Sequence, residues 1–134
     1  MFEIASIDHI VLRTSRLDDM LAFYCDVLGC AIERQETEEL GLIQLRAGNA
    51  LIDLVTVEGK LGRAGGGLPT RKNNNLDHFC LQLKPISQED IQRHLISRGV
   101  EVGEFEHRYG AQGFGQSIYI QDPEGNTVEL RSQI

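Results

Sequence analysis

The stretch Ile7-Asp8-His9-Ile10-Val11-Leu12 decides the fold, because the chain repeats its pattern as Leu76-Asp77-His78-Phe79-Cys80-Leu81. In both copies an apolar residue, an Asp and a His open a short apolar strand. An internal repeat of this kind indicates a duplicated structural unit. If the two units pack symmetrically, the repeat would bring the imidazoles of His9 and His78 together.

The composition is that of an ordinary globular protein. The chain has 134 residues, of which 41% are hydrophobic and 25% charged, enough to bury one core. No apolar run approaches the roughly 18 residues of a membrane span and no basic-then-apolar leader opens the chain, so we expect a cytoplasmic protein with no membrane partner. The net charge of −7 argues against nucleic-acid binding. The cysteines, Cys25, Cys30 and Cys80, are unclustered and fit reduced thiols better than a disulfide framework.

The apolar pattern of the first half predicts the element order β-α-β-β-β. Apolar residues recur at helical spacing from Met20 to Leu28, with Ser15 or Asp18 as the N-cap and Gly29 just past the helix end. The expected strands cover residues 7–12, 31–35, 41–46 and 50–57. The polar, glycine-rich segment 58–75 then predicts a linker or mobile loop.

The second half repeats the same order. A helix capped by Ser87 carries Ile91, Leu95 and Ile96 on its apolar face. The expected strands cover residues 76–83, 100–106, 116–121 and 126–131, and the glycine-rich stretch 107–115 is expected to be a loop. Helices placed among antiparallel hairpins indicate an α+β fold rather than a doubly wound α/β fold. We expect a single domain, 1–134, with modules at about 5–57 and 76–132 joined by the linker.

Alternation of side chains along each strand places isolated polar groups on one face. These groups are His9 and Asp53 in the first half, and His78 and Glu129 in the second. They occupy the first and last strands of the two units, the positions that would converge on an internal pseudo-twofold axis. Two imidazoles and two carboxylates suit a divalent ion such as Zn²⁺, Ni²⁺, Mn²⁺, Fe²⁺ or Co²⁺. The alternative is a pair of hydrogen-bonded, half-buried histidines with both carboxylates facing water.

These features resemble the vicinal oxygen chelate superfamily, which includes glyoxalase I, methylmalonyl-CoA epimerase, fosfomycin-modifying enzymes, extradiol dioxygenases and bleomycin-resistance proteins. The resemblance rests on four stretches that together extend over nearly the whole chain: 7–12, 22–29, 76–78 and 122–130. It implies a curved mixed sheet around a cavity with the helices outside. It also implies homodimers, in which the two subunits share strands or complete each other's sites.

The resemblance assigns roles residue by residue. His9, His78 and Glu129 match the family's metal ligands, and Asp53 stands where the family usually has Glu or Gln, one methylene longer. Arg13 matches an arginine that glyoxalase I uses for a glutathione carboxylate. The remaining expected substrate contacts are Tyr119, Gln44 and Arg131, and Arg131 could instead form an ion pair with Glu129 or a salt bridge at the rim.

The glyoxalase I-like branch implies a metal-dependent lyase or isomerase that abstracts a proton next to a carbonyl of a small substrate, acidic or linked to glutathione. Glu129 is the expected catalytic base and Asp53 the second candidate. One alternative is a ligand-sequestering protein of bleomycin-resistance type, with or without a metal. Another is a fosfomycin-type thiol transferase or an epimerase, although the acidic chain supplies few basic residues for their anionic substrates.

Overall fold

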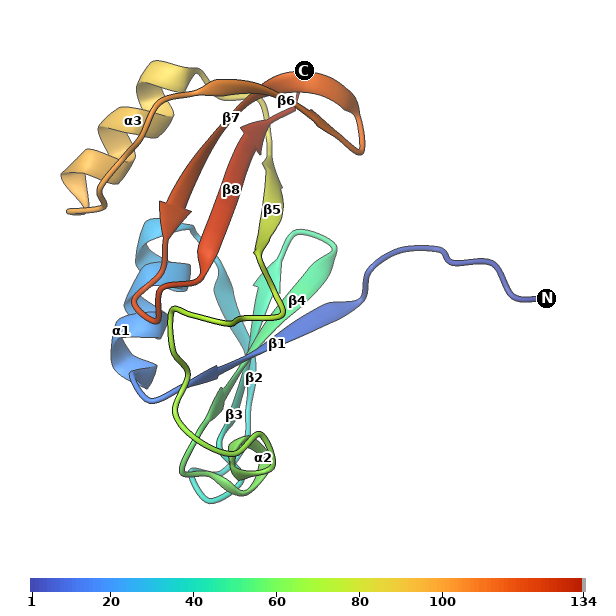
Figure 1. Ribbon diagram of the computed structural model, residues 1–134, viewed down its shortest axis with the longest axis vertical. Coiled ribbons are helices and arrows are strands. Elements are labelled where there is room, and N and C mark those ends of the chain that lie inside the picture. Colours follow the sequence, from blue (N-terminus) through green and yellow to red (C-terminus); the bar gives the residue numbers. More distant parts are fainter. Residues whose placement is uncertain (134) are drawn as a thin grey trace. The chain divides into compact units, whose positions relative to one another are not determined.

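The computed structural model describes residues 1–133 and divides the chain into two compact units, Met1–Pro69 and Thr70–Ile134. Each unit holds one four-stranded mixed sheet, with strand orders β1-β4-β3-β2 and β5-β8-β7-β6 (Figure 1). The two orders are equivalent, because β1 corresponds to β5 and β4 to β8. The predicted α+β fold of two repeated β-α-β-β-β modules is therefore confirmed.

In the first unit, the edge strand β1 and its neighbour β4 form the parallel pair of the sheet. The elements are β1 His9–Thr14, α1 Leu17–Leu21, η1 Ala22–Val27, β2 Ala31–Gln35, β3 Leu42–Ala47, β4 Ala50–Thr56 and α2 Lys60–Arg63. Strand β1 runs parallel to β4, while β3 runs antiparallel to both of its neighbours. One face of β4 carries the buried side chains of Ile52 and Leu54, so apolar alternation sets its register.

The helical segment of this unit differs from the prediction in its start and in its winding. Arg16 occupies the N-cap position without a side-chain cap, so the prediction of Ser15 or Asp18 was wrong. The hydroxyl of Thr14 instead accepts a hydrogen bond from Arg16 N, at 2.8 Å. From Ala22 to Val27 the helix widens to π geometry, and apolar periodicity alone does not distinguish this winding from an α-helix.

The segment expected to be a linker contains the short helix α2 and is tied to β1. Arg13 donates to the carbonyl oxygens of Gly62, Gly66 and Gly67 at 2.7–2.9 Å. Gly62 is buried against the end of β4, where its Cα lies over the carbonyl of Thr56. The first part of the segment is thus ordered by contacts that its glycine-rich composition does not indicate.

The second unit contains one longer helix and a long hairpin. Its elements are β5 His78–Leu83, α3 Gln88–Ser97, β6 Glu106–Gly110, β7 Gly113–Gln121 and β8 Thr127–Ser132. The cap at Ser87 is confirmed, since its hydroxyl accepts a hydrogen bond from Asp90 N at 3.1 Å. Ile91 and Leu95, one helical turn apart, are buried. Ile96 was wrongly placed on that face and is 63% exposed, because it lies about 100° further round the helix.

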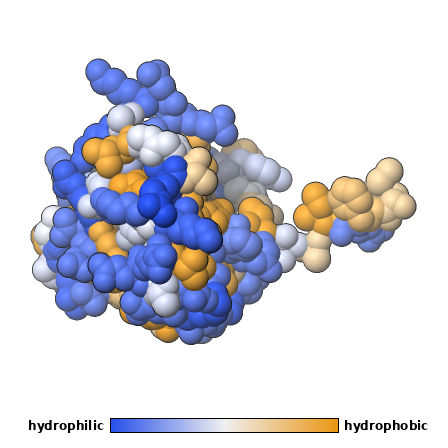
Figure 2. Space-filling view, turned by 90° about the horizontal axis from the view of Figure 1, so that it is seen from below, coloured by the Kyte–Doolittle hydropathy of each residue, from blue (hydrophilic) through white to orange (hydrophobic). Residues whose placement is uncertain are grey.

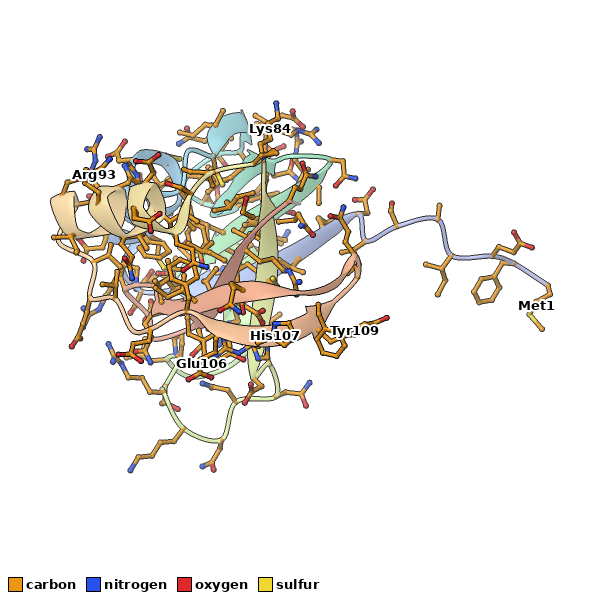
Figure 3. The ribbon with its side chains drawn as sticks, turned by 90° about the horizontal axis from the view of Figure 1, so that it is seen from above. Met1, Lys84, Arg93, Glu106, His107 and Tyr109 are labelled. Atoms are coloured by element: carbon orange, nitrogen blue, oxygen red, sulfur yellow. The ribbon has the colours of Figure 1, made fainter. Side chains whose placement is uncertain are left out.

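The hairpin β6–β7 differs from two predictions, the strand at 100–106 and the loop at 107–115. No strand forms over residues 100–105, and β6 occupies most of the stretch expected to be a loop, pairing Tyr109 with Phe114 and Gly110 with Gly113. Figure 3 shows His107 and Tyr109 along this strand. The ring of Phe114 stacks on His107 at 4.9 Å and meets Tyr109 edge-on at 5.0 Å. These ring contacts stabilise a hairpin whose glycines resemble loop residues in sequence.

The first eight residues form neither helix nor strand. They stand away from the rest of the first unit as an apolar segment (Figure 2), with exposed side chains at Phe2, Ile4 and Ile7. Within the described part of the chain, no helix has the length and apolar character needed to span a membrane.

Candidate functional site

The strand register of the first unit places His9, Asp53 and Gln44 on one face of its sheet. In the parallel pair, His9 is opposite Leu51 and Val11 is opposite Asp53. In the neighbouring antiparallel pair, Gln44 is opposite Asp53. Cross-strand partners project to the same side of a sheet, so the face that alternation predicts is the face that the structure forms.

Asp53 is a buried carboxylate, and one of its two oxygens has no hydrogen-bond partner among the described residues. Only 4% of the residue is exposed, so the water-facing alternative does not hold for it. Its Oδ2 accepts a hydrogen bond from Gln44 Nε2 at 3.1 Å, whereas its Oδ1 is buried without a partner in the structure of residues 1–133. A buried carboxylate oxygen without a donor is costly, and a cation bound there would remove that cost. Gln44, which the sequence predicts as a substrate contact, therefore orients Asp53 in this structure.

The imidazole of His9 is held by the residue that precedes it. Nδ1 of His9 lies 2.6 Å from Oδ1 of Asp8, and the side chain is about half exposed. The hydrogen bond to Asp8 raises the pKa of His9 above its ordinary value of 6.5, and the charge of Asp53 raises it further against the opposing effect of desolvation. With Nδ1 engaged, Nε2 is the nitrogen left for another partner.

The second unit repeats this construction with a closer contact. Nδ1 of His78 lies 2.7 Å from Oδ2 of Asp77, and Nε2 of His78 lies 3.2 Å from Oε1 of Glu129. Glu129 is only 6% exposed, so it too does not face water. Tyr119, opposite Glu129 across β7 and β8, places its ring edge-on to His78 with 5.2 Å between centroids.

The same three-part pattern therefore occurs in both sheets: an Asp on Nδ1, a His, and a buried carboxylate on the His face. A carboxylate that binds the remote imidazole nitrogen is typical of histidines that ligate metals, because it fixes the ring and its tautomer. Asp8 and Asp77 belong to the repeated sequence pattern, which predicts no role for them, although their recurrence before both histidines is a signal that the sequence contains. Within residues 1–133 no group of three or more His, Cys, Asp or Glu side chains is assembled as a metal site. Each unit holds one His and one buried carboxylate of the predicted set.

The two predicted arginine contacts have different surroundings. Arg13 has Nε, Nη1 and Nη2 all engaged by backbone carbonyls of its own unit. Arg131 is 5% exposed and donates from Nη2 to Gly113 O at 2.9 Å, while its Nε and Nη1 have no partner among the described residues. The alternative partner predicted for Arg131, an ion pair with Glu129, is not formed within that part of the chain.

Arg108 lies on the face of the second sheet that carries Tyr119 and Glu129. The sequence did not predict a role for this residue. Its guanidinium lies over the Tyr119 ring, 4.0 Å from the centroid, and donates to the carbonyl and hydroxyl oxygens of Ser117 at 2.8 and 2.9 Å. It was missed because residues 107–115 were expected to be a loop, where alternation of faces carries no information.

A pocket in the first unit lies away from these residues. It is lined by the β2–β3 connection and the start of α2, including Glu36, Glu39, Leu42, Thr56 and Gly59. None of the predicted ligands or substrate contacts lines it. Its several carboxylates make it acidic, and among its lining residues Arg63 is the one side chain suited to binding an anion.

Replacing Asp8 with Asn should lower the pKa of His9 toward 6.5, because the hydrogen bond to Asp8 is the main cause of the increase. The contact stabilises the folded chain most below the ordinary histidine pKa, and this contribution is lost as pH rises through the raised pKa. An NMR titration of the His9 ring proton measures this pKa in the wild type and in the Asp8→Asn variant. Asp18→Asn, a substitution at an exposed acidic residue, is the control. An unchanged His9 pKa in the Asp8 variant would contradict the assignment.

Comparisons with known proteins agree with the fold. The family model of the Glyoxalase/Bleomycin resistance protein/Dioxygenase superfamily matches residues 6–130. The virulence protein STM3117 of Salmonella typhimurium is 28% identical over 130 residues, covering 96% of this chain and 84% of that protein. Its crystal structure superposes with a TM-score of 0.73 at 26% identity, covering 99% of this chain and all of that one.

Two further relatives carry the names of enzymes. Biphenyl-2,3-diol 1,2-dioxygenase 3 of Rhodococcus globerulus is 31% identical over 131 residues, and the match covers 92% of this chain but 60% of that protein's length. Lactoylglutathione lyase from Agrobacterium tumefaciens shares the fold, with a TM-score of 0.69 at 23% identity over 96% of this chain and 94% of that one. On the family match over nearly its whole length, this chain belongs to the Glyoxalase/Bleomycin resistance protein/Dioxygenase superfamily.

Proposed function

We propose that this chain is a metal-dependent, glyoxalase-like lyase or isomerase that abstracts a proton next to a carbonyl of a small acidic substrate. The observation that carries the proposal is the repeated construction of the two sheets. In each, an Asp holds the Nδ1 of a His, and a buried carboxylate lies on the same sheet face. Nε2 of His78 already lies 3.2 Å from that carboxylate, Glu129, while Nε2 of His9 is left for another partner. A family that includes proteins named as lyases and dioxygenases supports metal chemistry as the purpose of such a set.

The proposed ligands are His9, Asp53, His78 and Glu129. Imidazole nitrogens and carboxylate oxygens without thiolates suit Zn²⁺, Ni²⁺, Mn²⁺, Fe²⁺ or Co²⁺. The unpartnered Oδ1 of Asp53 supports its inclusion despite the short side chain, since Gln44 holds the other oxygen. When bound, the ion would act as a Lewis acid that stabilises negative charge developing on a substrate oxygen.

The proton would pass to a buried carboxylate of the chain. Glu129 is the proposed base, because it is buried and its Oε1 lies 3.2 Å from Nε2 of the His78 imidazole. Asp53 is the second candidate. Because three carbonyls hold Arg13, the proposed substrate does not depend on a glutathione carboxylate at that residue, and glutathione remains one co-substrate to test.

Ring cleavage of a catechol is a second candidate function, favoured by the Rhodococcus relative and by the residue types present. His9, His78 and Glu129 are two histidines and one carboxylate, the set that non-haem iron oxygenases use. The chain matches 60% of that dioxygenase's length, so the activity of the whole relative is a hypothesis for this chain.

The test is to strip the purified protein with a chelator and reload it with each of the five metals. Turnover of methylglyoxal with glutathione would be followed as thioester formation, and turnover of catechol with Fe²⁺ as ring-cleavage product. We expect proton-abstraction activity with at least one metal, its loss on chelation, and its loss in His78→Ala. If the protein takes up metal but turns over only catechol, ring cleavage would replace proton abstraction as the proposed function. Light scattering in the same preparation tests the homodimer that the family resemblance implies.

A further inference from the structure

Arg131 is a buried cation whose hydrogen bonds are incomplete. The residue is 5% exposed, and only its Nη2 has a partner within the described chain, the carbonyl of Gly113 at 2.9 Å. Nε and Nη1 have none among residues 1–133. Burying charged N–H groups without acceptors is costly, so a bound water or anion is needed to complete their hydrogen bonds.

The hairpin beside Arg131 is shaped to admit its guanidinium. A Cβ on Gly110 would overlap Nη1, and a Cβ on Gly115 would lie 2.9 Å from Nη2. Glycine within a strand weakens the sheet, and it often marks a place where another group approaches the backbone closely. Two such glycines, one in each strand of the hairpin, leave the planar group lying against bare backbone.

Arg131 has charged neighbours on its face of the sheet. Ser117 is opposite Arg131 and Gly115 is opposite Arg108, so both guanidinium groups project to the same side. Arg108 is neutralised in part by Glu106, at 3.0 Å. Glu129 lies two residues before Arg131 on the same face of β8, which corresponds to about 7 Å along the strand. This face thus carries one uncompensated cation, Arg131, and one buried carboxylate, Glu129, which suits a monoanion better than a dianionic phosphate.

We propose that Arg131 binds the carboxylate of the substrate, through Nε and Nη1, and that the substrate is a short carboxylic acid carrying a carbonyl group. Arg131 and the proposed base Glu129 project from the same face of β8, two residues apart, so a substrate bound along that face would have its carboxylate at one end and its carbonyl toward the other. The part concerning the carbonyl rests on the proposed function, whereas the contact between Arg131 and a carboxylate does not require a metal. The anion-binding residue is therefore Arg131, in the second unit, rather than Arg13.

The test uses the full chain, freed of metal by a chelator, and follows the side-chain Nε–H signals of arginine by ¹⁵N NMR. Acetate is the charged probe, acetamide its neutral counterpart, and chloride at equal ionic strength the salt control. We expect acetate alone to shift the Arg131 signal in a saturable manner. The Arg13 signal, whose Nε–H is donated to Gly62, should stay unchanged in the same spectra.

Two variants complete the test. Arg131→Gln should raise the Kd for acetate at least about tenfold, the amount expected from losing a charged hydrogen bond. Arg108→Gln, which keeps Arg131 in place, should retain the shift of the Arg131 signal even if the Arg131→Gln protein folds poorly. No saturable shift at Arg131, or an equal shift with chloride, would overturn the proposal. Acetate binding in a chain that takes up no metal would contradict the proposed function and leave this inference standing.

Discussion

Replacing Glu129 with Gln is expected to weaken divalent metal binding at least about 100-fold, because partners that only orient a metal ligand are already worth roughly 10- to 100-fold. The substitution keeps the shape of the buried side chain and removes its charge. It also removes the carboxylate proposed as the base, so activity of the reloaded protein should fall by at least about 100-fold. Isothermal titration with Zn²⁺ or Ni²⁺ measures the first effect, and turnover at saturating metal measures the second.

Glu104→Gln is the matched control, since Glu104 is an exposed glutamate of the same unit and carries the same charge change. It should leave the metal Kd within about twofold of the wild type. Asp53→Asn tests the short ligand of the first unit, because it removes the charge at the unpartnered Oδ1. Equal metal affinity in wild-type and Glu129→Gln protein would exclude Glu129 as a ligand.

Replacing Gly62 with Ala is expected to lower the free energy of unfolding by about 3 kcal/mol, the upper end of the usual cost of overpacking. A methyl group at Gly62 would overlap the carbonyl of Thr56 and lie 3.0 Å from the Cα of Val57, so the contact is with backbone that cannot rotate away. The carbonyl of Gly62 also accepts a hydrogen bond from Arg13, which a shift of the helix would weaken. Thermal unfolding should show a fall in Tm of about 10 °C.

Gly67→Ala provides the comparison for this variant within the same segment. A Cβ at Gly67 has no atom within 4 Å, so its Tm should stay within about 2 °C of the wild type. Because the two substitutions add the same methyl group, the difference between them isolates the close approach at Gly62. Similar Tm values for both variants would show that α2 is not packed on β4 as described.

The element order was predictable because each module repeats local signals. Alternating apolar residues such as Ile52 and Leu54 marked the strands and their faces, and Ser87 marked a helix start through its own side chain. The same alternation placed His9 with Asp53 and His78 with Glu129 on their faces. These properties depend on residues within a few positions of one another, so the sequence carries them directly.

The hairpin β6–β7 was not predictable from such signals. Gly110 and Gly115 are typical of a loop by local rules, yet in the structure both lie in strands, against the side chain of Arg131. Their role is to make room for a residue on another strand, and neither periodicity nor turn propensity contains that information. Because β6 was not predicted, there was no basis in the sequence for assigning Arg108 to a face of the sheet.

The partners of the site residues also required the structure. Arg13 and Arg131 are both arginines on the predicted faces, but three carbonyls bind the first, whereas Nε and Nη1 of the second have no partner in residues 1–133. The burial of Asp53 and Glu129 depends on packing from distant parts of the chain. Alternation predicts which way a side chain projects, and only the assembled fold shows what it meets.

The claim that the two repeated His and carboxylate pairs serve a metal ion is tested most directly by counting the ions that the protein binds. Protein reloaded with Zn²⁺ or Ni²⁺ and freed of excess ion should contain one ion per chain by elemental mass spectrometry. The content should fall toward zero in His9→Ala and in His78→Ala, and stay at one in the exposed-histidine control His94→Ala. No bound ion in the wild type, or a full ion in either ligand variant, would contradict the claim.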